Sequence, residues 1–343
     1  MKKQGTRSSI IFSALVCSFV SLFFIVEAAW PHDSVKDMRG QTFTDPAKTV
    51  PMPEGWIKQP IRYDKENEGA DIVIMMDQDI YHTLLPAVQK YAKEKNLKIN
   101  MIEGTCGIAA GMLAKKTADM GGFCCPAGTE DRLPGLRFHT IGIVAQAFFV
   151  NPDNPVDNIS GTQLRDIYLG KLKRWSEVKT QAGRKGPDRP IKTLARLHCP
   201  LRPGHWRQLL DDKTKFGPGV SEVGSIPDMI SQVASTKDAI GWEVLTMSER
   251  NKKLGMVKPL KINGYKPNDS DALALLKYPF YRTYQVTTWE GKGVENRYAA
   301  KLVEYLIKEF EKLDPDKFGF VSQSWLRKAG WQFRGDELIG EPK

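Results

Sequence analysis

From residue 70 onward, continuous apolar runs alternate with amphipathic stretches. The run ADIVIMM at 70–76 is typical of a strand that is covered on both faces. Residues 79–96 predict a helix, because their apolar positions share one face: Ile80, Leu84, Val88 and Tyr91. A second strand is predicted at 97–104, a short helix at 107–117 and a third strand at 118–123. This order implies parallel strand pairing with helices on both faces of the sheet.

A long apolar run at 136–152 divides this first part of the chain from the next. The run is long enough to leave one lobe and enter another. The segment from 158 to 255 then holds its own helices, a strand at 191–197 and a compact strand at 238–245. The remaining elements are predicted to return to the first lobe: strands at 256–262 and 278–289, and an amphipathic helix at 297–313.

The N-terminus has the pattern of a secretory signal peptide. Lys2, Lys3 and Arg7 precede an apolar stretch at 10–26, and small residues follow at Ala28 and Ala29. We expect cleavage after Ala28 or Ala29; the alternative is a retained anchor at the short limit for a spanning helix. Because no later segment approaches that length, the remainder is expected to be extracytoplasmic, with membrane contact only through the signal peptide.

The composition limits the kinds of partner that the protein can bind. Loss of residues 1–28 removes three basic residues and one acidic residue, which lowers the formal net charge from +10 to +8. A basic surface favours anionic partners, but export separates the protein from nucleic acid. The mature length is too great for one compact core and suits two lobes. Proline-rich residues 29–69 are predicted to form an extended arm on the surface.

Four cysteines remain in the mature chain: Cys106, Cys124, Cys125 and Cys199. In an oxidising compartment, disulfides are the ordinary interpretation of such a set. Four cysteines allow three pairings, and the sequence does not choose among them.

LRDIYLGKLKRW, which follows the turn NPDNPV, is the most specific of several stretches that resemble the periplasmic phosphate-binding proteins (PstS-like) and, more broadly, the type II substrate-binding proteins of ABC transporters. The others, in family order, are EGTCGIAAGMLAKKTADMGGF, DAIGWEVL, YPFYRTYQVTTW and the closing AAKLVEYLIKEF with FGFVSQSWLRKAGW. Together they cover about residues 70–335.

The resemblance implies an α/β fold of two lobes, each a mainly parallel sheet flanked by helices, with the ligand in the cleft between them. It places lobe 1 at 70–148 and 257–343, and lobe 2 at 149–256. Such proteins close on their ligand like a hinge. The resemblance implies a binding protein and not an enzyme.

The ligand loops depart from the family pattern. The family places serine and threonine hydroxyls around phosphate, whereas this chain places thiols, carboxylates and cations at those positions. By family position the candidate ligand-binding residues are Asp77, Gln78, Thr105, Cys106, Gly107, Cys124, Cys125, Arg196, His198, Cys199 and Arg202. Since the hydroxyl donors are missing, we predict that phosphate is not the physiological ligand.

Three interpretations of the cysteines stay open. In the first, Cys106, Cys125 and Cys199 bind a thiophilic ligand: trivalent arsenic or antimony, or Cu(I) or Zn(II) with His198 or His205 as a further ligand. In the second, disulfides brace the loops, and Arg196, Arg202 and backbone N–H groups hold a small anion.

In the third interpretation, Cys199 with His198 or His205 forms a thiol nucleophile of an enzyme. Neighbouring strand residues point to opposite faces, which argues against a pairing of His198 with Cys199. The sequence also contains no recognised catalytic motif.

The sequence thus predicts an extracytoplasmic protein that captures a small oxyanion or a thiophilic metal or metalloid. The captured ligand would pass to an ABC transporter permease or to a sensor protein. The alternative is a copper- or zinc-binding or delivery protein. No cofactor is firmly implied beyond a possible bound soft metal or metalloid.

Overall fold

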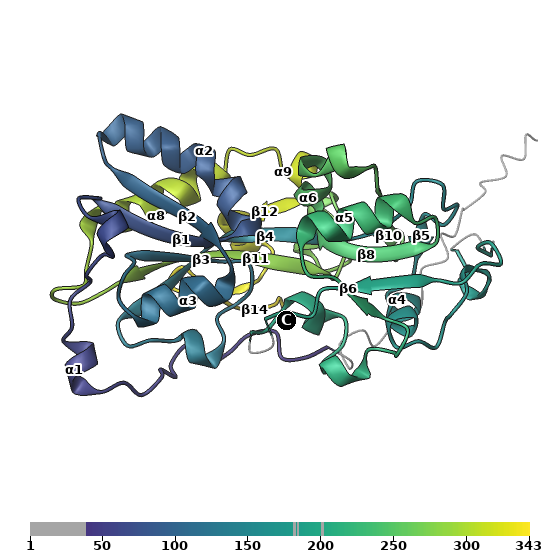
Figure 1. Cartoon of the computed structure of the whole chain (residues 1–343), viewed down its shortest axis with the longest axis horizontal. Coiled ribbons are helices and arrows are strands. Elements are labelled where there is room, and N and C mark those ends of the chain that lie inside the picture. Colours follow the sequence, from purple (N-terminus) through teal and green to yellow (C-terminus); the bar gives the residue numbers. More distant parts are fainter. Residues whose placement is uncertain (1–38, 181–182, 184, 200–201) are drawn as a thin grey trace, which may run out of the picture.

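The computed structural model describes residues 39–180, 183, 185–199 and 202–343, arranged as two α/β lobes (Figure 1). The predicted signal peptide and residues 29–38 of the predicted arm lie outside the described residues. The two-lobe fold expected from the sequence is confirmed. Within the described residues, no helix is both long enough and apolar enough to cross a membrane.

The first lobe is built around three parallel strands in the order β2-β1-β3. Its elements are β1 (Ile72–Asp77), α2 (Gln78–Lys95), β2 (Ile99–Gly104), α3 (Cys106–Ala114) and β3 (Met120–Phe123). Every residue of β1 is buried, as the continuous apolar run predicted. The α2 helix buries the predicted face, and Asn96 ends it in a left-handed conformation.

Two long antiparallel strands, β4 (Leu136–Val150) and β11 (Tyr281–Trp289), lie at the centre of the sheet. The first part of β4 pairs with β11, and its last five residues pair with β8 of the second lobe. The strand order is therefore continuous across both lobes, β2-β1-β3-β11-β4-β8-β6-β7. As the long apolar run predicted, β4 leaves one lobe and enters the other (Figure 1).

The second lobe packs helices around β6 and β8, with a core rich in aromatic side chains. Trp175, Trp206 and Trp242 are almost completely buried there. Its strands are β5 (Asn158–Ile159), β6 (Lys192–Ala195), β7 (Ser221–Glu222) and β8 (Ala239–Val244). Its helices are α4 (Gly161–Tyr168), α5 (Ile226–Ser235) and α6 (Leu245–Arg250).

The prediction for residues 256–262 is wrong. They form two short strands, β9 (Lys258–Pro259) and β10 (Lys261–Ile262), and not one strand that returns to the first lobe. The β9 strand pairs with the last residues of β4, and β10 pairs with β5. Pro259 lacks an N–H donor, which suits a short edge strand and not a central one.

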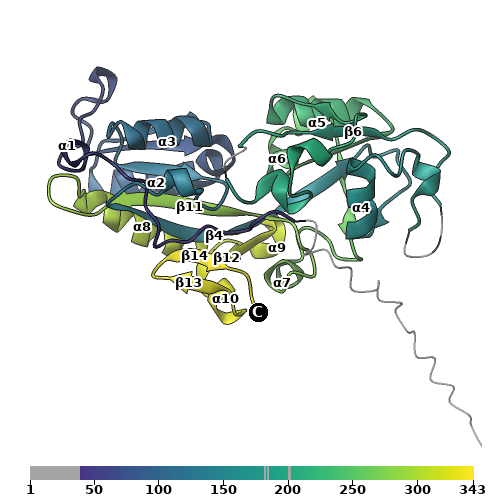
Figure 2. The same ribbon diagram turned by 90° about the horizontal axis from the view of Figure 1, so that it is seen from below.

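The remaining elements pack around β4 and β11, and those from β12 onward lie below β4 in Figure 2. They are α7 (Ser270–Ala274), α8 (Arg297–Phe310), α9 (Pro315–Phe318), β12 (Phe320–Ser322), α10 (Gln323–Lys328), β13 (Gln332–Arg334) and β14 (Glu337–Gly340). The α8 helix buries the apolar face that the sequence predicted and packs on α2.

The segment before β1 runs along both lobes. Its backbone hydrogen-bonds to Arg207 of the second lobe through Gly40, and to Arg132 of the first lobe through Val50. The segment includes one short helix, α1 (Glu54–Ile57). Its position adds a second connection between the lobes beside the crossing strands.

Candidate functional site

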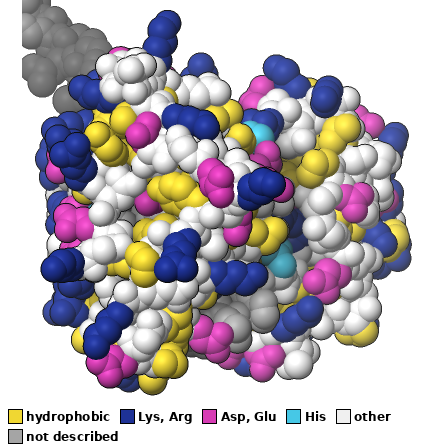
Figure 3. All heavy atoms as spheres, turned by 60° about the vertical axis from the view of Figure 1, so that its left-hand side comes forward, with side chains coloured by type: hydrophobic (Ala, Val, Ile, Leu, Met, Phe, Trp, Pro, Cys, Tyr) yellow, Lys and Arg dark blue, Asp and Glu magenta, His cyan; other side chains and the backbone are white. Residues whose placement is uncertain are grey.

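A cavity of about 600 Å³ lies between the lobes, and residues of both lobes line it. The first lobe contributes Asp77, Gln78, Thr105, Gly107, Ala110, Gly111, Ala114, Gly128, Glu130 and Asp131. The second lobe contributes Arg196, His198, Cys199, Arg202 and Gly224. A hollow between the two halves of the molecule is visible in Figure 3, with a histidine side chain beside it.

The strand ends explain why these loops meet. Because β1 and β2 are parallel and Asp77 is in register with Gly104, the loops that follow both strands open at the same edge. Asp77 caps α2 by accepting a hydrogen bond from the N–H of Asp79. Thr105 caps α3 by accepting one from the N–H of Ile108. The end of β3 then brings Cys124 and Cys125 to this edge.

Three of the four cysteines form a buried cluster beneath the cavity. Cys106 Sγ lies 3.7 Å from Cys124 Sγ, and Cys124 Sγ lies 4.0 Å from Cys125 Sγ. Cys199 arrives from the second lobe, and its thiol interacts with those of Cys106 and Cys125. All four cysteines are free thiols in the structure.

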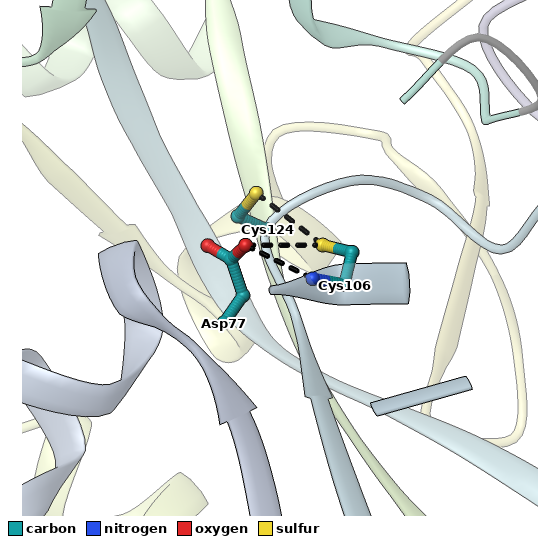
Figure 4. Close-up of side chains that lie close together, drawn as sticks. All are labelled: Asp77, Cys106 and Cys124. Carbon is teal, nitrogen blue, oxygen red and sulfur yellow. Dashed lines mark hydrogen bonds between the residues drawn. The ribbon is translucent and has the colours of Figure 1, made fainter. Parts of the chain in front are cut away.

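A carboxylate lies against this cluster. The N–H and the Sγ of Cys106 lie 3.2 Å and 3.4 Å from Asp77 Oδ2. Figure 4 shows the side chains of Asp77, Cys106 and Cys124 pointing toward one another. The ligand atoms of these three buried residues all lie within 4.8 Å of one another, which is close enough to hold one metal ion.

Two buried guanidinium groups lie behind the thiols. Arg282 Nη1 lies 2.7 Å from Asp79 Oδ2 and donates to Cys124 Sγ at 3.1 Å. Arg196 donates to Glu243 Oε1 at 2.6 Å, and the other oxygen of Glu243 lies 3.9 Å from Arg282. These charges come from both lobes and form one network at the lobe junction.

A third guanidinium closes one side of the cluster. Arg202 makes two hydrogen bonds to the carboxylate of Asp131, at 2.6 and 2.8 Å. Its Nη2 group, one of the two donors to Asp131, also donates to the carbonyl of Cys106 at 3.2 Å. Each of the three arginines at this site therefore already has a carboxylate partner.

The four thiols form two pairs whose pKa values shift in opposite directions. Hydrogen bonds from neighbouring thiols lower the pKa of Cys124 and of Cys199, and Arg282 and His198 lower them further. The same contacts raise the pKa of Cys106 and of Cys125. The hydrogen bonds therefore favour the ionised form at Cys124 and Cys199 relative to Cys106 and Cys125.

Burial also changes the carboxylates. It raises the pKa of Asp77 well above its ordinary value, and the nearby Cys124 sulfur raises it further. Burial raises the pKa of Asp79 to about 7, although Arg282 opposes that change. Burial therefore disfavours the ionised form of both carboxyl groups.

Two histidines stand beside Cys199. The rings of His198 and His205 lie 4.5 Å apart, edge to face. His205 is almost completely buried, and neither ring nitrogen has a hydrogen-bond partner among the described residues. Burial holds the pKa of His205 well below its usual value, so the ring is neutral.

The geometric argument against a contact between His198 and Cys199 is wrong. It assumed that both residues lie on a strand, but β6 ends at Ala195. Cys199 adopts a left-handed backbone with φ of 58°, which turns the chain. The His198 imidazole hydrogen-bonds to the thiol.

Every candidate residue from the sequence lies at or directly beneath the cavity. Sequence reasoning missed the buried partners Asp79, Asp131, Glu243 and Arg282 as parts of the site. A signal was present for two of them: Glu243 and Arg282 are the single charged residues of otherwise uncharged strands. Buried charges require partners, so such positions point to a polar site.

Two α/β lobes joined by crossing strands, with a cavity lined from both, are the architecture of the periplasmic binding protein fold. The family model described as "PBP superfamily domain" matches residues 65–309. The chain belongs to this superfamily, and the resemblance found in the sequence is confirmed.

Two curated relatives are both named as the phosphate-binding protein PstS. The one from Bacillus subtilis is 24% identical over 71% of this chain and 78% of its own length. The one from Staphylococcus saprophyticus is 24% identical over 74% of this chain and 80% of its own length.

Solved structures support the same fold. A putative phosphate ABC transporter substrate-binding protein from Clostridium perfringens, with bound phosphate, has a TM-score of 0.58 at 16% identity. That similarity covers 78% of this chain and 98% of that one. An ABC-type phosphate transport receptor from Vibrio cholerae has a TM-score of 0.52 at 18% identity, covering 77% and 100% of the two chains.

Proposed function

We propose that this protein is an extracytoplasmic solute-binding protein that captures one small ligand in the cavity between its lobes. The observation that carries the proposal is the lining of that cavity by residues of both lobes. A ligand that touches both lobes stabilises the closed form relative to the open one, so binding is coupled to lobe closure. The lobes would move about β4 and β11.

The captured ligand would pass to a membrane partner. The relatives of solved structure are named as transport receptors or substrate-binding proteins of ABC transporters, which supports an ABC transporter permease as that partner. A sensor protein is the other candidate partner. The signal-peptide pattern at the N-terminus supports export to the compartment where such a partner would be met.

Two ligand classes are considered. The names of the relatives support phosphate or a similar small oxyanion. In this cavity an oxyanion would meet the N-terminus of α3, where N–H groups favour negative charge. It would also meet Arg196 and Arg202, but both already pair with carboxylates.

The composition of the site favours the second class, a thiophilic metal or metalloid. Thr105 is the one hydroxyl side chain among the residues that line the cavity, and it accepts a bond from the α3 backbone. Thiols replace the hydroxyl donors that an oxyanion would need. Oxyanion recognition would require at least one arginine to exchange its carboxylate partner for the ligand.

The test is calorimetric titration of the reduced mature chain with phosphate, arsenate, arsenite, Zn²⁺ and Cu⁺, with lobe closure followed by small-angle scattering. We expect one ligand class to saturate at one equivalent, to reduce the radius of gyration, and to be released unchanged without turnover. Phosphate binding with a micromolar dissociation constant would identify an oxyanion as the ligand. Failure of every compound to close the lobes would contradict the proposed function.

A further inference from the structure

The four thiols gather in one place although they come from distant parts of the chain. Cys106 begins α3, Cys124 and Cys125 follow β3, and Cys199 follows β6 in the other lobe. Three of them are completely buried, and Cys199 alone lines the cavity. A stabilising role in the apolar core would not require all the cysteines of the mature chain to meet at the ligand cavity.

The sulfur separations fit coordination better than disulfide bonding. A disulfide requires a separation of about 2.05 Å. A tetrahedral ion with Zn–S bonds of about 2.3 Å places its sulfur ligands about 3.8 Å apart. The separation of 3.7 Å between Cys106 and Cys124 is close to that value, and among the described residues Asp77, Cys106 and Cys124 form the group whose ligand atoms all lie within 4.8 Å of one another.

The charges around the cluster favour a cation. Four buried carboxylates belong to the site: Asp77, Asp79, Asp131 and Glu243. Three guanidiniums oppose them, and each is already paired: Arg196 with Glu243, Arg202 with Asp131 and Arg282 with Asp79. Asp77 is the carboxylate left over, and it lies against Cys106. An anion placed here would therefore find no guanidinium without a carboxylate partner.

We propose that Asp77, Cys106 and Cys124 bind one thiophilic d¹⁰ metal cation, Zn²⁺ or Cu⁺, as the ligand of this cavity, and that Cys199 completes the coordination from the second lobe. The inference rests on the proposed function and names its ligand. Thiolate sulfur is the donor that these cations prefer. As each metal–ligand bond forms, a ligand group that was protonated releases its proton to solvent. Asp77 supplies a carboxylate oxygen as the third ligand from the first lobe.

The division of the thiols between lobes gives the site a release mechanism. Three ligands, Asp77, Cys106 and Cys124, belong to the first lobe and one, Cys199, to the second. Closing the lobes would complete the coordination, and opening them would withdraw Cys199 and weaken it. The ion would enter and leave on the side of Cys199, because that thiol is the one in contact with the cavity.

The test titrates reduced mature protein with Zn²⁺, Cd²⁺ or Cu⁺ against a competing chelator, and follows cysteine alkylation and lobe closure in parallel. We expect one equivalent to bind, with thiolate-to-metal absorption for Cd²⁺ and protection of the three ligand cysteines. These readouts need no variant, so they hold even if a substituted protein folds poorly.

Single substitutions distinguish what each lobe contributes to metal binding. Cys106→Ser and Asp77→Asn should each lose more than the roughly 10–100-fold of affinity that loss of a partner outside the ligand set costs, whereas Cys125→Ser should fall within that range. Cys199→Ser should still bind one equivalent, more weakly, without lobe closure. Met256→Leu is the control, because Met256 is a thioether that is 60% exposed and outside the site; its affinity should equal that of the unmodified protein.

Two results would overturn the metal site. One is absence of one-equivalent binding by the reduced protein for all three cations; the other is a pair of disulfides in protein taken from its native compartment. If phosphate or arsenite closes the lobes while the cations do not, the metal site fails and the proposed solute capture stands. If no compound closes the lobes, both fail.

Discussion

Arg282 is the most heavily connected charge at the lobe junction, and its removal should be costly. Its side chain is completely buried and is hydrogen-bonded to Asp79, Cys124 and Gln146. Arg282→Met would leave the carboxylate of Asp79 buried without its partner. Breaking such a pair costs about 3–5 kcal/mol of unfolding free energy.

The measurement is urea unfolding followed by circular dichroism, with Arg137→Met as the matched control. Arg137 pairs with Glu290 at 2.6 Å, but both side chains are more than half exposed. A pair of this kind contributes about 0–1 kcal/mol. Adding Asp79→Asn to Arg282→Met removes the unpaired charge and should restore at least about 1 kcal/mol. Equal losses for Arg282→Met and Arg137→Met would refute the view that the buried network holds the junction.

Two further predictions concern local structure, and both are measured by the same unfolding assay. Ser160 caps α4 in a reciprocal capping box with Gln163, so Ser160→Ala should cost about 1 kcal/mol; no loss would show that the cap is not stabilising. A Cβ on Gly142 would lie 2.3 Å from the carbonyl of Val321, so Gly142→Ala should cost about 1–3 kcal/mol by overpacking β4 against β12. Gly111→Ala is its control, because no atom lies within 4 Å of the added Cβ and alanine favours the helix more than glycine does. This variant should be more stable by about 0.5–1 kcal/mol. A larger loss of stability for Gly111→Ala than for Gly142→Ala would contradict the packing described.

The sequence predicted the fold well where one pattern dominates. The buried run of β1, the amphipathic faces of α2 and α8 and the long crossing strand β4 all follow from apolar periodicity. Residues 256–262 were misplaced because a short apolar run contains no information on which lobe it joins. That choice depends on pairing with β4 and β5, which are distant in sequence.

The site was predictable only in part. Loop position brought Asp77, Cys106 and Cys199 together as candidates, but it did not reveal which charges neutralise which. The pairing of Arg282 with Asp79 joins residues about two hundred positions apart, and only the folded sheet brings them into contact. The contact of His198 with Cys199 was missed because the left-handed turn at Cys199 has no glycine to mark it.

The most direct test of the account is native mass spectrometry of the protein isolated from its own compartment. We predict the mass of the mature chain with four reduced cysteines and one bound ligand, with Zn²⁺ or Cu⁺ as the expected mass difference. If the bound ligand is an oxyanion, the proposed solute capture stands and the proposed metal ligand is wrong. A chain that carries no ligand and has its cysteines joined in disulfides would contradict the central claim.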